Sequence, residues 1–312
     1  MKTHFRGRDF LTLMDFTREE IEFVIDTAME FKRFWASKIS HRGLWGRVVG
    51  LLFEKPSTRT RVSFMAALAH LGATPLQLNP NVMQLSRGEP IKDTARVLDR
   101  YLDALVIRTF GQEIVEEYAR YMVNPVINAL TDLTHPMQGL ADLMTIWEFK
   151  GRYNRVKIGY VGDIWNVCHS LMIISSIFGY EMYIARPSGY DADKRILDFV
   201  YDVSKNTGAN IQFTDDVVEA FKDADVIYAN TWHSMGGPEM EKEKRLRDWS
   251  GYQANTENTR VAKEDYIFMH CLPGYRGEEM TDEIIEGRHS VVFEQAENRL
   301  HTEKAVLSLV IP

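Results

Sequence analysis

Short runs rich in apolar and β-branched residues alternate along the whole chain with segments of helical periodicity, and this alternation constrains the fold more than any other feature. The predicted strands are 48–54, 75–79, 104–110, 125–129, 156–162, 181–186, 210–214, 226–230, 266–272 and 291–294. The predicted helices include 18–35, 61–71, 91–101, 112–122 and 193–205. Because strands that alternate with helices form parallel sheets covered by helices, the sequence predicts an α/β fold.

Two lobes fit the length of 312 residues, since one domain typically takes about 100–200. A predicted helix begins near Met137 and ends at Lys150 and Gly151, a cationic last turn followed by a helix-stopping glycine. We therefore expect two consecutive doubly wound parallel-sheet lobes joined by helices, residues 1–150 and 151–297. A C-terminal helix within 298–312 is expected to pack back on the first lobe.

Composition excludes several classes of protein. The net charge of −7 provides no global basic field for nucleic acid. Cys168 and Cys271 cannot form a disulfide framework, which indicates a reducing compartment. The first twenty residues contain no long apolar run, and the apolar stretch 170–185 is too short and too polar for a membrane span, so it is interpreted as a buried helix followed by a strand. We expect a cytosolic protein without a nucleic-acid or membrane partner.

An anion site is predicted where the strand 48–54 runs into residues 55–61 and a helix. Ser57 is the expected N-cap of that helix, and Gly72 the expected end. Free backbone N–H groups and the positive end of the helix dipole favour an anion there, and three hydroxyls and two guanidiniums add donors suited to phosphate. The alternative is a capped helix with solvated arginines. The spacing of a P-loop is missing.

The sequence Ser-Thr-Arg-Thr-Arg at 57–61, preceded by Phe-Glu-Lys-Pro at 53–56, closely resembles the carbamoyl phosphate signature of aspartate and ornithine carbamoyltransferases. Further motifs of that family follow in order: Arg108, His-Pro-Met-Gln at 135–138, Ser-Met-Gly at 234–236, His-Cys-Leu-Pro at 270–273 and Glu-Asn-Arg-Leu-His at 297–301. The resemblance implies transfer of a carbamoyl group from carbamoyl phosphate to an amine, without a metal or an organic cofactor. His-Cys-Leu-Pro and Ser-Met-Gly favour ornithine over aspartate as the acceptor.

The resemblance also assigns roles to residues. Those assigned to carbamoyl phosphate are Ser57, Thr58, Arg59, Thr60, Gln84, Arg108, His135, Gln138, Cys271, Leu272 and Arg299. Thr60, Arg108 and His135 would face the carbonyl oxygen, and Cys271 joins the last two as a catalytic residue. Arg61 has two open interpretations, a site residue or a buttress of the loop through an ion pair. Gln84 would reach the site of a neighbouring subunit, which implies a homotrimer or a multiple of one.

The residues assigned to ornithine are Asn166, Asn230, Ser234 and Met235. Asn166 could equally be a turn residue at a strand–helix junction. Asn230 stands where the family usually has Asp, and loss of a charge-assisted hydrogen bond costs about 1.5–3 kcal/mol. Ornithine is therefore the predicted acceptor, with a related amine (putrescine, lysine or an acylated ornithine) as the alternative.

More distant alternatives are a nicotinamide-dependent oxidoreductase, an aspartate-type transferase and a non-catalytic paralogue that binds ligand. The segment 162–166 lacks the second and third glycines of a dinucleotide fingerprint, which disfavours the oxidoreductase. The charged segment 239–247 is interpreted as a solvated helix face with i,i+4 ion pairs, or with residues 236–238 as a lid over the amino acid.

Overall fold

The computed structural model describes residues 4–152, 155–233 and 239–312. The chain divides into two compact units: unit 1 is Met1–Leu140 with Glu297–Pro312, and unit 2 is Ala141–Ala296. Two helices, α5 (Pro136–Lys150) and α12 (Val292–Val310), each contribute residues to both units. Within the described ranges, none of the helices combines the length and the apolar character that a membrane span requires.

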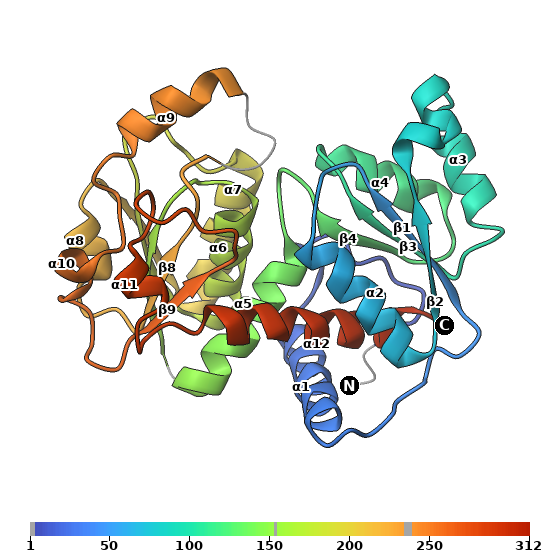
Figure 1. The fold of residues 1–312 in the computed structure, drawn as a ribbon, viewed down its shortest axis with the longest axis horizontal. Coiled ribbons are helices and arrows are strands. Elements are labelled where there is room, and N and C mark those ends of the chain that lie inside the picture. Colours follow the sequence, from blue (N-terminus) through green and yellow to red (C-terminus); the bar gives the residue numbers. More distant parts are fainter. Residues whose placement is uncertain (1–3, 153–154, 234–238) are drawn as a thin grey trace. The chain divides into compact units, whose positions relative to one another are not determined.

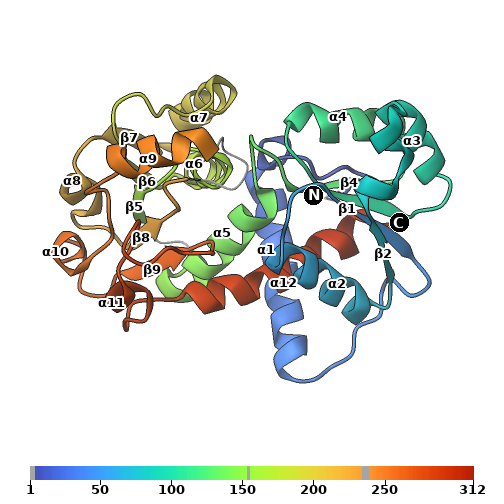
Figure 2. The ribbon, with the colours of Figure 1, turned by 45° about the horizontal axis from the view of Figure 1, so that its top comes forward.

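Unit 1 contains a parallel sheet with strand order β2-β1-β3-β4. Its strands are β1 (Val48–Phe53), β2 (Thr74–Leu78), β3 (Ala104–Arg108) and β4 (Val126–Leu130). Its helices are α1 (Arg18–Ala36), α2 (Arg59–Leu71), α3 (Ile91–Leu98) and α4 (Gln112–Tyr121), with 3-10 turns at Leu13–Asp15, Pro80–Val82 and Gln84–Arg87. Helices α3 and α4 cover one face of the sheet, and α2 and the unit 1 part of α12 lie side by side on the other (Figures 1 and 2).

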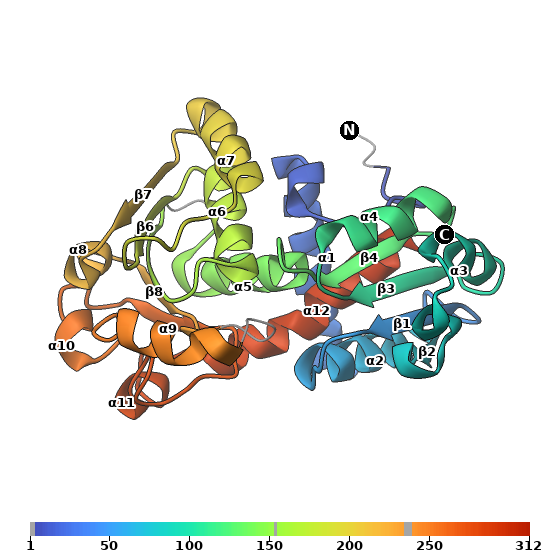
Figure 3. The same cartoon turned by 90° about the horizontal axis from the view of Figure 1, so that it is seen from above.

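Unit 2 contains a second parallel sheet with strand order β7-β6-β5-β8-β9. Its strands are β5 (Lys157–Val161), β6 (Glu181–Ala185), β7 (Asn210–Thr214), β8 (Val226–Ala229) and β9 (Ile267–His270). Its helices are α6 (Asn166–Phe178), α7 (Lys194–Thr207), α8 (Val217–Phe221), α9 (Lys242–Asp248), α10 (Thr256–Thr259) and α11 (Asp282–Ile285), and Glu239–Glu241 is a 3-10 turn. Helices α6 and α7 lie on one face of this sheet and α8 on the other (Figure 3).

Close packing of α8 on its sheet depends on a glycine. A Cβ atom on Gly159 of β5 would lie 2.7 Å from the carbonyl oxygen of Ala220 and 2.8 Å from the ring of Phe221. Both neighbours belong to α8 and are fully buried. A larger residue at 159 would therefore push α8 away from the sheet.

The two-lobe α/β fold is confirmed, and nine of the predicted strands are present with ends shifted by at most two residues. The predicted strand 291–294 is wrong, because a continuous helix begins at Val292 and only an isolated bridge joins Phe268 to Ser290. A short apolar run does not distinguish a strand from the buried start of a helix. The predicted N-cap is also wrong, since α2 begins after Thr58 and not Ser57, whereas Gly72 ends it as expected.

Candidate active site

The predicted anion loop lies between the carboxyl end of β1 and the first turn of α2. Thr58 occupies the N-cap position in a helical backbone conformation, and its side chain accepts no hydrogen bond from the start of the helix. Ser57 is half-buried and Thr58 and Arg59 are exposed, whereas Thr60 is buried. The loop thus presents hydroxyls, a guanidinium and a helix N-terminus at one place, as anion binding requires.

Four predicted site residues from four elements meet through hydrogen bonds. Arg299 of α12 donates to Gln138 Oε1 of α5 at 2.9 Å and to Thr60 Oγ1 of α2 at 3.2 Å. Arg108, the last residue of β3, also donates to Thr60 Oγ1, at 3.4 Å. All four side chains are at least 95% buried. Two buried guanidiniums converging on one hydroxyl form a strongly electropositive centre for a small anion.

A buried carboxylate that the motifs did not reveal balances part of this charge. Glu303 is fully buried, and its Oε1 lies 3.0 Å from Nη2 of Arg299, one helical turn earlier on α12. Burial raises the pKa of Glu303 to about 7, against the opposing effect of Arg299. The i,i+4 spacing of Arg299 and Glu303 is the sequence signal that could have identified this pair.

His135 precedes α5 and is buried. Burial, followed by the positive charges of Arg299, Arg108 and Arg59, lowers its pKa well below the ordinary value of 6.5. The imidazole is therefore neutral at pH 7 and can donate one N–H group without carrying a charge.

Arg61 does not form the ion pair that one interpretation required. Its guanidinium lies over the ring of Phe53 at 5.4 Å, and no ion pair joins it to another residue in the described part of the chain. Instead, the strand ends are held by Lys55 with Asp132 and by Glu54 with Thr109. Lys55 also lies 4.5 Å from the centroid of the Phe110 ring. These contacts stabilise the loop. Motifs could not predict them, because the partners lie far apart in the sequence.

In unit 2, three predicted site residues follow the carboxyl ends of three neighbouring strands. Asn166 begins α6 after β5, Asn230 follows β8, and Cys271 follows β9. Cys271 Sγ lies 3.4 Å from Oδ1 of Asn230, whose backbone N–H donates to the carbonyl of Val161 at 2.8 Å. A Cβ atom on Gly162, which has φ +124°, would lie 2.1 Å from the carbonyl oxygen of Asn230. Glycine is therefore required for this close approach of the chain segments.

A polar network holds the residues around Cys271. The N–H of His270 donates to Oε1 of Gln295 at 2.9 Å, and Gln295 donates to Asp142 at 2.6 Å. Nδ1 of His270 accepts the N–H of Leu272 at 2.8 Å, and Nε2 lies 3.1 Å from Oε1 of Glu279. His270 therefore fixes Leu272, which has φ 57°, a conformation that L-residues rarely adopt.

Comparison with known proteins identifies the family. A family model for the carbamoyl-P binding domain of aspartate/ornithine carbamoyltransferase matches residues 8–148, and the model for the Asp/Orn binding domain matches 154–310. An ornithine carbamoyltransferase of Pyrococcus horikoshii is 49% identical over 311 residues, which cover 100% of this chain and 98% of that protein. The chain belongs to the aspartate/ornithine carbamoyltransferase family.

Relatives from distant organisms support this assignment. An ornithine carbamoyltransferase of Listeria innocua is 47% identical over 312 residues, which cover 100% of this chain and 98% of that protein. The solved ornithine carbamoyltransferase of Pyrococcus furiosus matches with a TM-score of 0.94 at 48% identity, covering 99% of this chain and 98% of that one. The ornithine transcarbamoylase of Giardia lamblia matches with a TM-score of 0.85 at 30% identity, covering 97% of each chain. The family predicted from the motifs is confirmed.

One ion pair within unit 2 was missed in this carbamoyltransferase sequence. Arg245 of α9 lies 2.7 Å from Oδ1 of the buried Asp163, which follows β5. The predicted i,i+4 pairs are present, Lys244 with Asp248 at 3.3 Å and Arg245 with Glu241 at 3.5 Å. Helix α9 is therefore more than a solvated face, because Arg245 fastens it to the end of β5.

Gln84, Ser234 and Met235 complete the predicted site residues. Gln84 lies exposed in the turn Gln84–Arg87, and no hydrogen bond joins its side chain to another residue that the structure describes. Ser234 and Met235 lie outside the described residues. Their assignment to the amino acid continues to rest on the family resemblance.

Proposed function

We propose that the protein transfers the carbamoyl group of carbamoyl phosphate to the side-chain amine of L-ornithine, giving L-citrulline and phosphate. The observation that carries the proposal is the buried contact of Arg108 and Arg299 with Thr60 beside the exposed Arg59. The relatives that are nearly half identical over the full chain carry the name ornithine carbamoyltransferase. Unit 1 would hold carbamoyl phosphate and unit 2 the amino acid, in line with the two family models.

The reaction needs a neutral amine, a polarised carbonyl and a stabilised leaving group. The amine nitrogen attacks the carbonyl carbon, the carbonyl oxygen becomes negative, and the bond from carbon to the phosphate oxygen breaks. Phosphate leaves with the bonding electron pair, and the amine loses a proton to phosphate or solvent. Positioned donors at the developing oxyanion supply most of the rate gain, so Arg108, Thr60 and the neutral His135 are assigned to that oxygen.

The remaining unit 1 residues serve the phosphate. Ser57, Thr58 and Arg59 supply hydrogen-bond donors at the start of α2, and Arg299 adds a second positive charge for the phosphate. Gln138, whose Oε1 accepts from Arg299, is assigned to the amide of the carbamoyl group. In unit 2, the backbone of Leu272, which His270 holds in place, is assigned to the carbamoyl group together with Cys271.

Steady-state kinetics of three arginine variants tests these roles. Arg108→Met should lower kcat by about 10²–10³, the cost of removing one oxyanion donor. Arg59→Met should mainly raise KM for carbamoyl phosphate. Arg120→Met is the control, because that arginine of α4 is exposed and is assigned no role in the reaction. Wild-type kinetics in the first two variants would refute the assignments.

A related amine is the second candidate acceptor, and one observation favours it. Asn230 is 3% exposed and presents a neutral Oδ1 to Cys271, where the family usually has a carboxylate. Initial rates with ornithine, putrescine, lysine and acylated ornithine decide between the acceptors. If ornithine is the acceptor, Asn230→Asp should retain or improve kcat/KM for it. A tenfold preference of the wild type for another amine would overturn ornithine.

We further propose a cytosolic homotrimer, or a multiple of one, in which Gln84 contacts carbamoyl phosphate in the site of a neighbouring subunit. The exposed side chain of Gln84 suits this role. Subunit mixing tests it, because Gln84→Ala and Arg108→Met trimers are each impaired. Mixed trimers should regain activity, since some sites then contain both native residues. Mixing without any gain would contradict a shared site.

A further inference from the structure

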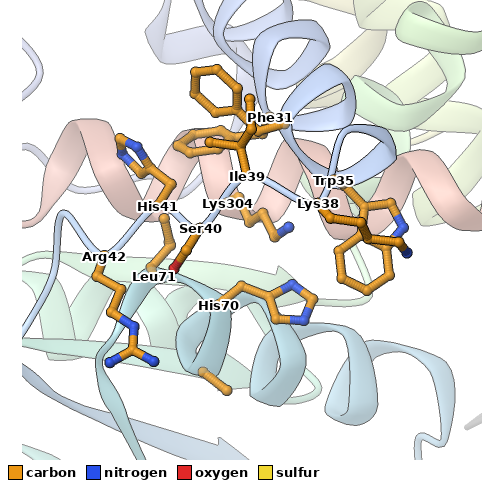
Figure 4. Close-up of a pocket in the computed structure, with 12 residues that line it drawn as sticks. Phe31, Trp35, Lys38, Ile39, Ser40, His41, Arg42, His70, Leu71 and Lys304 are labelled. Atoms are coloured by element: carbon orange, nitrogen blue, oxygen red, sulfur yellow. The ribbon is translucent and has the colours of Figure 1, made fainter.

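A cavity of about 280 Å³ lies in unit 1, apart from the residues assigned to the reaction. It is lined by the end of α1, the segment that follows it, the end of α2 and one residue of α12 (Figure 4). Lys38, with φ 57°, follows the C-cap residue Ser37 of α1, at the point where the chain turns along the cavity. A cavity of about 150 Å³ already accommodates a benzene-sized molecule, so a small organic ligand fits here.

The lining is basic and aromatic. Its charged members are Lys38, Arg42 and Lys304, and the described residues that line it include no Asp or Glu. The apolar lining includes Phe31, Phe34, Trp35, Ile39 and Leu71. A site with only positive charge in a chain of net charge −7 selects an anion, and the apolar walls select an apolar body.

Lys304 is the centre of this site. The residue is 4% exposed, and no hydrogen bond or ion pair joins its ammonium to any residue in the described part of the chain. Its only close partner of note is the ring of Trp35, whose centroid lies 5.3 Å from Nζ. An ammonium that is partly removed from water and has no anionic partner is destabilising, and such perturbed charges cluster at functional sites.

Two rings frame the ammonium. Trp35 stacks on His70 with centroids 4.7 Å apart, and Lys304 reaches between α1 and α2 toward them (Figure 4). Nδ1 of His70 is buried without a hydrogen-bond partner among the described residues. Burial, with Lys304 nearby, lowers the pKa of His70, so the ring is neutral at pH 7 and can donate one N–H group.

We propose that this cavity binds a small carboxylate with an aromatic or branched apolar body, whose carboxylate pairs with Lys304. The single buried ammonium matches a monovalent carboxylate, and the N–H of His70 offers a second donor to it. The apolar body lies against Phe31, Ile39 and Leu71. The site is independent of the transferase reaction, since none of its residues is assigned to carbamoyl phosphate or ornithine.

Calorimetric titration with benzoate, in saturating inorganic phosphate to fill the transferase anion site, tests the proposal. The wild type should bind benzoate at least tenfold more tightly than benzyl alcohol, its neutral analogue. Lys304→Met should weaken benzoate binding at least tenfold. The control Arg33→Met, which removes an exposed cation of α1 outside the cavity lining, should change it less than threefold.

Three results would overturn the proposal. They are the absence of saturable benzoate binding to the wild type, equal affinity for benzoate and benzyl alcohol, and benzoate binding that survives Lys304→Met. The first two need no variant. A melting curve of Lys304→Met establishes that the variant is folded.

Discussion

Glu303→Gln should remove a specific pH dependence of stability. Glu303 is fully buried beside Arg299, and its pKa rises from 4.5 to about 7 on folding. The folded state therefore binds more protons than the unfolded state between these values. The resulting stabilisation is complete below pH 4.5 and is lost as pH rises through 7. A displacement of this size corresponds to about 3 kcal/mol.

Melting temperatures of the wild type and the variant at pH 5, 6, 7 and 8 measure this effect. For a unit of this size, about 3 kcal/mol shifts Tm by roughly 6–12 °C. From pH 5 to pH 8, the Tm of the variant should therefore rise by that amount relative to the Tm of the wild type. The difference between the two proteins is decisive, because His135 and His301, whose pKa values are lowered, give the wild type an opposite slope. The exposed Glu294→Gln on the same helix is the control.

The reasoning fails if the difference in Tm between Glu303→Gln and wild type stays constant from pH 5 to 8. That result would mean that Glu303 titrates alike in the folded and unfolded states. The ion pair with Arg299 would then cancel the cost of burying the carboxylate.

Three further predictions concern other ionisable side chains. The neutral His135 predicts that its own titration adds no loss of kcat as pH falls from 8 to about 6.5. A loss of kcat around pH 6.5 that His135→Gln abolishes would contradict this. Arg245→Met should lower the free energy of unfolding in urea by about 3 kcal/mol, and adding Asp163→Asn to this variant should restore part of that loss. An unchanged urea midpoint in Arg245→Met would refute the role of this pair. Burial lowers the pKa of Lys304 to about 8. The charged ammonium therefore destabilises the folded state below pH 8, and this destabilisation is lost above pH 10.5. Lys304→Met should therefore raise stability at pH 7 by up to about 2 kcal/mol after solvent screening, and a lower Tm would contradict this.

Local periodicity was sufficient to predict both sheets, because each strand is a short apolar run bounded by turn residues. It failed at 291–294, where Val291 and Val292 are buried as in a strand but a helix begins at Val292. Motif order predicted the meeting of Thr60, Arg108, Gln138 and Arg299 within unit 1. Family resemblance, and not local pattern, supplied that part of the site.

Contacts between distant segments could not be predicted from the sequence. The pairs Lys55 with Asp132 and Asp163 with Arg245 join residues that only the fold brings together. The cavity around Lys304 likewise depends on how α12 lies against α1 and α2 (Figure 4). Glu303 is different, because its i,i+4 spacing from Arg299 is visible in the sequence.

Citrulline formation from carbamoyl phosphate and ornithine, compared between wild type and Arg108→Met, tests the central claim most directly. Rapid, metal-independent formation by the wild type, with a loss of about 10²–10³ in kcat for the variant, is the predicted result. No product from ornithine or any other amine, or equal rates in both proteins, would contradict the account of the buried arginines as the carbamoyl transfer site.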